Sequence, residues 1–335
     1  MTLARTAAAV ALTVAVGLTM PTVGLDPVAA RPTRPAGPVR HVLAISVDGL
    51  RPATLERLGA TRAPAYHRML REGAGTLNAR SAVERTTTLP NHTGMLTGRP
   101  VARARGGHGV AENNDGGGTV HAAAGEHVGS VFDVVAASGG RTALFTAKDK
   151  FALFRRSWGR SIDRFHVDED NAALVRAVRT ELVTRPRRLT FLHLSLPDRA
   201  GHAHGFTSAA YVAAVRRTDR LLGSLLATVR RHAWLRDHLV VVLTADHGGT
   251  THGHTDAAAL SNYRVPFLTW GAGVSRGRDL YGLNPELDRP GTRRPGYTGD
   301  QPVRNGDLAN LVCDVLGLPS VRGSQLNAGQ RLDLR

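Results

Sequence analysis

The sequence predicts a three-layer α/β/α fold with a mostly parallel central sheet. Short apolar runs alternate along the chain with segments of helical periodicity. The connections between them are short, which is typical of one α/β domain rather than of several small ones. With 335 residues, 42% of them hydrophobic, the chain can bury a sizeable core.

The predicted elements follow one another in the order that such a fold needs. Strands are expected at 41–47, 141–147, 189–196, 238–245 and 263–270. Helices are expected at 63–73, 130–140, 171–183 and 208–232, where apolar residues recur every three or four positions. Two glycine-rich stretches, 104–125 and 275–303, are expected to be loops. We therefore expect a single domain over 41–335.

Residues 1–30 have the features of a signal peptide. Arg5 supplies a positive charge, residues 6–20 are apolar, and small residues at 28–30 suit cleavage. The apolar run is short for a membrane span. We expect an exported protein without a stable membrane anchor after cleavage, in which 31–40 form a Pro/Arg-rich linker.

The net charge of +16 comes almost entirely from arginine, because Lys148 and Lys150 are the only lysines. A basic surface attracts polyanions, phosphates or acidic membranes. The arginines form no dense block in the sequence, however, and few aromatic residues interleave with them. We therefore expect scattered surface charge and no specific reader of nucleic acid. The sequence does not indicate an oligomeric state.

Three predicted strands lead into a carboxylate: Asp48, Asp198 and Asp246. In an open α/β sheet, ligands bind outside the carboxyl ends of the strands. A single such aspartate is equally well explained as a helix cap or turn residue. Three of them predict a site at one edge of the sheet.

Histidines accompany two of these aspartates. His202 follows Asp198 by four positions, His247 follows Asp246 directly, and His252 and His254 come next in a glycine-flanked loop. Carboxylate oxygens with neutral imidazoles, and no thiolate, suit Zn²⁺, with Mn²⁺ or Fe as alternatives. Six ligands exceed the needs of one tetrahedral ion. The pattern predicts two ions, of the kind found roughly 3.5–4 Å apart in enzymes of phosphoryl transfer. Each histidine taken alone could be an ordinary polar residue of a loop.

The stretch "TTTLPNHTGMLTG" is predicted to enter a helix that begins at Pro90. A residue just before a helix lies where backbone N–H groups and the helix dipole can hold a phosphate. A threonine there could be an N-cap, a nucleophile activated by a metal, or both.

These motifs together resemble the alkaline phosphatase superfamily, most closely its type I phosphodiesterase/nucleotide pyrophosphatase branch. The likeness runs from "VDGLRP" to the C-terminal "NGDLANLVCDVLGLP". It implies that Thr88, just before Leu-Pro-Asn-His, is the nucleophile. It also implies that Asn113 of "HGVAEN" holds a phosphoryl oxygen, with Asn114 the less favoured choice.

The resemblance further implies two ligand sets. One metal would be held by Asp48, Asp246 and His247 and would contact Thr88. The other would be held by Asp198, His202 and a later histidine, His254 in preference to His252.

The implied function is that of an exported hydrolase of phosphodiester or pyrophosphate bonds, with two zinc ions, a phospho-threonine intermediate and a small phosphate ester as substrate. The neutral Asn113 suits a singly charged diester, and the formylglycine signature of sulfatases is absent around Thr88. Alternatives are a phosphomonoesterase or phosphonate hydrolase of the same superfamily, or a non-catalytic polyanion-binding protein. Lys148 or Lys150, in "FTAKDKFALF", is expected either to steer phosphate or to be a solvated helix start.

Overall fold

The computed structural model describes residues 39–251 and 253–335. The predicted signal peptide, nearly all of the predicted linker and His252 lie outside the described residues. Within the described part, the strands form one eight-stranded sheet in the order β4-β3-β5-β1-β6-β7-β2-β8. The strands are β1 (His41–Val47), β2 (Ala74–Arg80), β3 (Thr142–Thr146), β4 (Arg164–Val167), β5 (Leu189–Leu194), β6 (Leu239–Thr244), β7 (Arg264–Gly271) and β8 (Arg278–Asp279).

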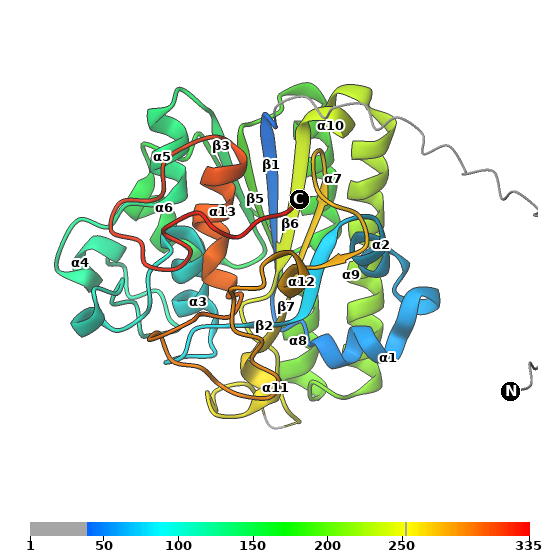
Figure 1. The fold of residues 1–335 in the computed structure, drawn as a ribbon, viewed down its shortest axis with the longest axis horizontal. Coiled ribbons are helices and arrows are strands. Elements are labelled where there is room, and N and C mark those ends of the chain that lie inside the picture. Colours follow the sequence, from blue (N-terminus) through cyan, green and yellow to red (C-terminus); the bar gives the residue numbers. More distant parts are fainter. Residues whose placement is uncertain (1–38, 252) are drawn as a thin grey trace, which may run out of the picture. The chain divides into compact units, whose positions relative to one another are not determined.

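Helices cover both faces of this sheet (Figure 1). On one side α3, α5 and α13 pack together, and on the other α9 packs against α2, α7 and α8. The α-helices are α1 (Pro52–Arg62), α2 (Pro64–Glu72), α3 (Thr88–Thr97), α4 (Val120–Ala124), α5 (Val131–Ala137), α6 (Ala152–Trp158), α7 (Asn171–Thr184), α8 (Leu196–His204), α9 (Ala209–Arg231), α10 (Ala233–His238), α11 (Leu260–Tyr263), α12 (Leu280–Leu283) and α13 (Leu308–Val315).

The predicted fold class is confirmed, and most strand pairs are parallel. Every residue of β1, β5 and β6 is buried, which explains why these strands read as unbroken apolar runs. The exception is β7, which runs antiparallel to both β6 and β2. An antiparallel neighbour needs no helical crossover, and only a loop and the four-residue α11 separate β6 from β7.

Several predicted boundaries are wrong by one or two residues: the strand expected at 189–196 ends at Leu194, and the helix expected to begin at Pro90 begins earlier. Helix α3 begins at Thr88, two residues before Pro90, with Thr87 as its N-cap in an extended conformation. Pro90 still lies in the first turn, where its missing N–H costs no helical hydrogen bond. All ten residues of α3 are buried, so this helix is an internal element rather than a surface one.

Both predicted loops are largely irregular, although each includes short helical turns. The first contains α4, and the second contains β8 and α12. Among the described helices, none is long and apolar enough to cross a membrane.

Candidate metal centre and nucleophile

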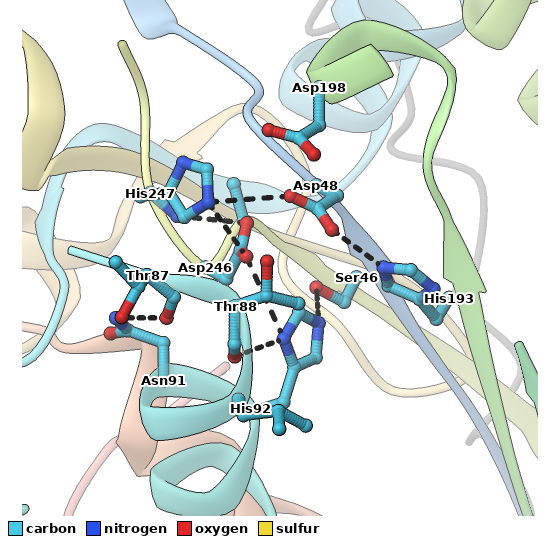
Figure 2. Close-up of polar contacts among 12 residues, drawn as sticks. Ser46, Asp48, Thr87, Thr88, Asn91, His92, His193, Asp198, Asp246 and His247 are labelled. Carbon is cyan, nitrogen blue, oxygen red and sulfur yellow. Dashed lines mark hydrogen bonds and ion pairs between the residues drawn. The ribbon is translucent and has the colours of Figure 1, made fainter. Parts of the chain in front are cut away.

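The three aspartates predicted from strand ends lie at one edge of the sheet. Asp48 directly follows β1, Asp246 follows β6 by two residues, and Asp198 is the third residue of α8, after β5. Because β5, β1 and β6 are adjacent, the three carboxylates converge, as Figure 2 shows. Each of these residues is at most 2% exposed.

Gly49 allows this convergence. Its φ of 69° lies in the left-handed region, and a Cβ there would lie 3.1 Å from the Cα of Asp198. Its backbone N–H donates to Asp246 Oδ1 over 3.1 Å, while its carbonyl accepts from the Tyr211 hydroxyl over 2.7 Å. A residue with a side chain at this position would push the β1 and α8 segments apart.

The first cluster consists of Asp48, Asp246 and His247, whose ligand atoms all lie within 4.8 Å of one another. His247 Nε2 is 3.4 Å from Asp48 Oδ1 and 3.2 Å from Asp246 Oδ2. The other ring nitrogen, Nδ1, donates to the carbonyl of Gly248 over 2.9 Å. This bond fixes the tautomer and leaves the lone pair of Nε2 directed at the carboxylates.

The second cluster consists of Asp198, His202 and His254. His202 Nε2 lies 3.3 Å from Asp198 Oδ1 and 3.0 Å from His254 Nε2. His254 Nδ1 donates to the carbonyl of Thr86 over 2.6 Å, so its Nε2 carries the lone pair and faces His202. The side chain of His202 is 57% exposed, which opens this cluster to solvent.

The donor atoms fit divalent metal ions. Four buried ligand atoms, from both clusters, have no hydrogen-bond partner within the described chain: Asp48 Oδ1, Asp198 Oδ1, Asp246 Oδ2 and His247 Nε2. Buried polar atoms are rarely left unpaired unless an ion or a water satisfies them. Burial lowers the pKa of His247 to about 3 and also lowers that of His254, so both imidazoles are neutral, as metal ligands must be. Carboxylate oxygens with imidazole nitrogens are a ligand set for zinc, with manganese or iron as alternatives.

Lys148 links the two clusters. Its Nζ lies 2.7 Å from an oxygen of Asp48, 2.7 Å from one of Asp198, and 3.3 Å from the Thr88 hydroxyl oxygen. Of the two roles expected for it, the solvated helix start is wrong, because this side chain is only 16% exposed. Lys150 instead donates to the backbone carbonyl of Asn113.

The charges at this edge of the sheet shift the pKa values of Asp48 and Asp246 in opposite directions. Burial works to raise the pKa of Asp48, but the Lys148 ammonium and the hydrogen bond from His193 outweigh it and hold that pKa well below its usual range. Burial and the charges of Asp48 and Asp198 raise the pKa of Asp246 well above its usual range. The edge therefore carries more negative charge than its one lysine can compensate.

His193 on β5 holds Asp48 in place. The backbone N–H of Ala147 donates to Nδ1 of this ring over 3.3 Å, so the proton of the neutral ring is on Nε2. That Nε2–H donates to Asp48 Oδ2 over 3.0 Å. Both partners are completely buried, and Figure 2 shows the contact. Since Ala147 precedes Lys148, His193 positions both the carboxylate and the segment that carries the lysine.

Thr88 is the first residue of α3, and neighbouring side chains fix its backbone. His92 Nδ1 donates to the Thr88 carbonyl over 2.8 Å, while His92 Nε2 accepts from the Ser46 hydroxyl on β1 over 2.8 Å. Asn91 donates to the carbonyls of Arg85 and Thr87. Figure 2 shows the Thr88 hydroxyl on the side of the carboxylates.

Asn113 also lies at the start of this helix. Its Oδ1 accepts from the backbone N–H of Leu89 over 3.0 Å. The amide nitrogen of Asn113 forms no hydrogen bond within the described residues and remains available as a donor. Asn114, the alternative, is exposed.

The predicted site residues thus come together from six separate segments of the chain. His254 lies in the second cluster, whereas His252 lies outside the described residues. Sequence reasoning missed His193, His92 and Asn91, although the "PNH" of the "TTTLPNHTGMLTG" stretch and the histidine within the apolar strand at 189–196 were visible. The carbonyl of Thr86 accepts from His254 and so orients this candidate ligand.

Comparison with known proteins gives one family and several distant relatives. A family model described as type I phosphodiesterase / nucleotide pyrophosphatase matches residues 42–115 and 133–286, more than half of the chain. GPI ethanolamine phosphate transferase 1 of Mus musculus is 26% identical over 175 residues, which are 52% of this chain and 18% of that protein. Ectonucleotide pyrophosphatase/phosphodiesterase family member 7 of Rattus norvegicus is 32% identical over 82 residues, 24% of this chain and 18% of its own length. The chain therefore spans less than a fifth of these curated relatives.

Solved structures share the fold at low identity. Murine ectonucleotide pyrophosphatase/phosphodiesterase 5, in an inactive form with AMP, superposes with a TM-score of 0.62 at 15% identity, covering 88% of this chain and 100% of that one. A protein in the alkaline phosphatase superfamily from Vibrio parahaemolyticus gives a TM-score of 0.61 at 12% identity, covering 88% of this chain and 70% of that one.

Substitution of Asp246 by asparagine is expected to stabilise the metal-free protein. The raised pKa of Asp246 means that its charge costs stability progressively as pH rises above the usual carboxyl pKa. Asparagine would still accept from Gly49 N–H, and its amide would donate to the unpaired Nε2 of His247. We expect a gain of roughly 1 kcal/mol or more in EDTA at pH 7.5, measured by thermal unfolding. Zinc should stabilise the wild type much more than the variant; a variant that is less stable in EDTA would contradict this account.

Substitution of His193 by alanine is expected to weaken zinc binding by about 10–100-fold, because Asp48 loses the bond that orients it. Glutamine, which can still donate to Asp48, should restore part of the affinity. Zinc affinity is measured by competition with a chromogenic chelator. His204→Ala, at an exposed position on α8, is the matched control and should leave the affinity unchanged. Equal affinities for the alanine variant and the wild type would show that His193 has no positioning role.

Proposed function

The chain belongs to the type I phosphodiesterase/nucleotide pyrophosphatase family, and from this premise we propose that it is an exported, metal-dependent hydrolase of phosphodiester or pyrophosphate bonds. The observation that carries the proposal is the placement of Thr88 next to two clusters of unpaired, buried ligand atoms. Export rests on the sequence of residues 1–30 alone.

Asp48, Asp246 and His247 would hold one divalent ion, and Asp198, His202 and His254 the other, zinc being our proposal for both. When bound, such ions polarise a phosphate group and lower the pKa of hydroxyl groups and water. With both ions present, the excess negative charge of this edge would be neutralised. The site would then be able to accept an anionic substrate.

The proposed reaction has two steps. Thr88 Oγ attacks phosphorus, the ester or anhydride bond to the leaving oxygen breaks, and the hydroxyl proton passes through solvent to that oxygen, so that the remaining phosphoryl group stays on the threonine. Water then attacks the same phosphorus, which releases the second product and restores the Thr88 hydroxyl. Support for this nucleophile comes from murine ectonucleotide pyrophosphatase/phosphodiesterase 5, whose AMP complex was solved in an inactive threonine-to-alanine form.

Residues around Thr88 would stabilise the negative charge on the non-bridging oxygens of the phosphoryl group. The Lys148 ammonium lies 3.3 Å from the attacking oxygen. The Asn113 amide, whose oxygen accepts from Leu89 N–H, and the N-terminal end of α3 would provide uncharged donors near Thr88. One lysine and a neutral amide suit the single charge of a diester better than the double charge of a monoester. A phosphomonoesterase or phosphonate hydrolase is therefore the less favoured candidate.

Transfer to an alcohol is a second candidate, because several curated relatives are GPI ethanolamine phosphate transferases. The first step would be the same, and only the acceptor in the second step would differ. The exposure of His202 favours water as the acceptor, since it opens the second cluster to bulk solvent.

The test compares the purified chain on bis-p-nitrophenyl phosphate, p-nitrophenyl phosphate and p-nitrophenyl sulfate. We expect the diester to be cleaved fastest, zinc to support the reaction and EDTA to abolish it. Thr88→Ala should lower kcat by at least about a hundredfold, while Thr88→Ser, which keeps a hydroxyl, should retain measurable activity. The acceptor is tested by adding ethanolamine or glycerol and looking for the transferred product.

His204→Ala serves as the control that should behave as wild type. Full metal-dependent activity in Thr88→Ala would overturn the nucleophile assignment. Two bound zinc ions without turnover of any ester would favour the non-catalytic polyanion-binding alternative.

A further inference from the structure

A basic cavity of about 660 Å³ lies at the sheet edge opposite the metal centre. Its size is within the range of small-ligand sites. Five of its nine lining residues are arginines, and the lining residues come from four segments of the chain: Val39, Arg40, His41, Arg141, Arg185, Pro186, Arg187, Arg188 and Trp234. The expectation of scattered surface charge therefore fails here, because the fold gathers arginines that are far apart in the sequence.

The order of strands in the sheet brings these arginines together. Arg141, Arg188 and Arg40 lie just before β3, β5 and β1, which are neighbours in the sheet. Backbone hydrogen bonds hold the three segments in line: Arg188 N donates to Arg141 O, and Val42 N donates to Arg188 O, each over 2.9 Å. The arginines are thus presented by rigid strand ends rather than by a free loop.

Most of the positive charge in this cavity is uncompensated. Arg187 is paired with Glu181 at 2.5 Å, and Arg141 lies 3.4 Å from Asp163. Arg188 donates only to neutral acceptors. Within the described residues, the guanidinium groups of Arg40 and Arg185 have no carboxylate partner, and both residues are exposed.

An aromatic pair forms one wall of the cavity. His41 Nδ1 donates to the carbonyl of Arg187 over 2.6 Å, and the ring centroids of His41 and Trp234 are 4.6 Å apart. Trp234 is 44% exposed, whereas Trp158 and Trp270, the other two tryptophans, are buried. A change in tryptophan fluorescence when a ligand binds in this cavity should therefore come from Trp234.

We propose that this cavity binds a short chain of linked phosphates. Guanidinium groups pair with phosphate oxygens through two parallel hydrogen bonds. Adjacent strands are about 4.8 Å apart, so arginines before three neighbouring strands span roughly 10 Å, longer than one phosphate and suited to two or three linked phosphates. The site is separate from the metal centre, because it lies at the amino ends of strands whose carboxyl ends carry Asp48 and Asp198. It requires no metal.

The test titrates tripolyphosphate into metal-loaded protein in the Thr88→Ala background, so that no turnover occurs, and follows tryptophan fluorescence. We expect saturable binding that is stronger than that of orthophosphate or of citrate at equal ionic strength. Repeating the titration in EDTA should leave the affinity unchanged, which separates this cavity from the metal centre. A failure here would leave the proposed hydrolysis at the other edge untouched.

The double variant Arg40→Ser/Arg185→Ser should bind tripolyphosphate at least about tenfold more weakly. Each of the two substitutions removes a charge-assisted hydrogen bond to the phosphates. Arg216→Ser/Arg217→Ser, on the exposed face of α9, removes the same charge elsewhere and should bind as the parent does. Trp234→Phe should lose the fluorescence signal but keep the affinity measured by calorimetry. Equal weakening in both double variants, equal binding of citrate, or no saturable binding would overturn the proposal.

Discussion

The burial of three aspartate carboxylates at one edge of the sheet is the constraint on which the rest of the structure depends. Removing a carboxylate from water costs several kcal/mol unless cations and hydrogen bonds compensate for it. In the described chain, Lys148 is the one ammonium group that contacts the cluster, and it pairs with two of the three. The cluster therefore lacks positive charge and hydrogen-bond donors. This lack is seen in its unpaired buried oxygens and in the raised pKa of Asp246. Divalent cations are the simplest charges that would satisfy all of these atoms together.

The neighbouring structure can be understood as support for that edge. Gly49 lets two aspartate-bearing segments approach each other, and His193 holds Asp48 from the adjacent strand. Backbone carbonyls fix the tautomers of His247 and His254. On the other side, Asn91 and His92 fix the start of α3, so that Thr88 is held next to the carboxylates. The Asn and His of the Leu-Pro-Asn-His motif thus hold the backbone at Thr88.

The sequence predicted the structure best where a local pattern of residues determines it, and least well where contacts join residues far apart in the chain. The strand at 41–47 was predicted to the residue, since a strand buried on both faces is a continuous apolar run. The convergence of Asp48, Asp198 and Asp246 followed from the general position of ligands at strand ends. The sequence could not show the bond between His193 and Asp48, which are 145 residues apart, or the direction in which Lys148 points. The helix start was misplaced because Pro90 is favoured in the first turn but does not determine which residue of that turn it occupies.

The central claim, that Thr88 becomes covalently attached to phosphorus, can be measured directly. Zinc-loaded protein is mixed with a diester substrate, quenched in acid within the first turnover and digested, and its peptides are weighed by mass spectrometry. The account predicts that the peptide containing Thr88 carries the mass of the phosphoryl group together with its remaining ester substituent, and that this adduct is absent from Thr88→Ala. Turnover with the adduct on another residue, or with no adduct at any quench time, would contradict it.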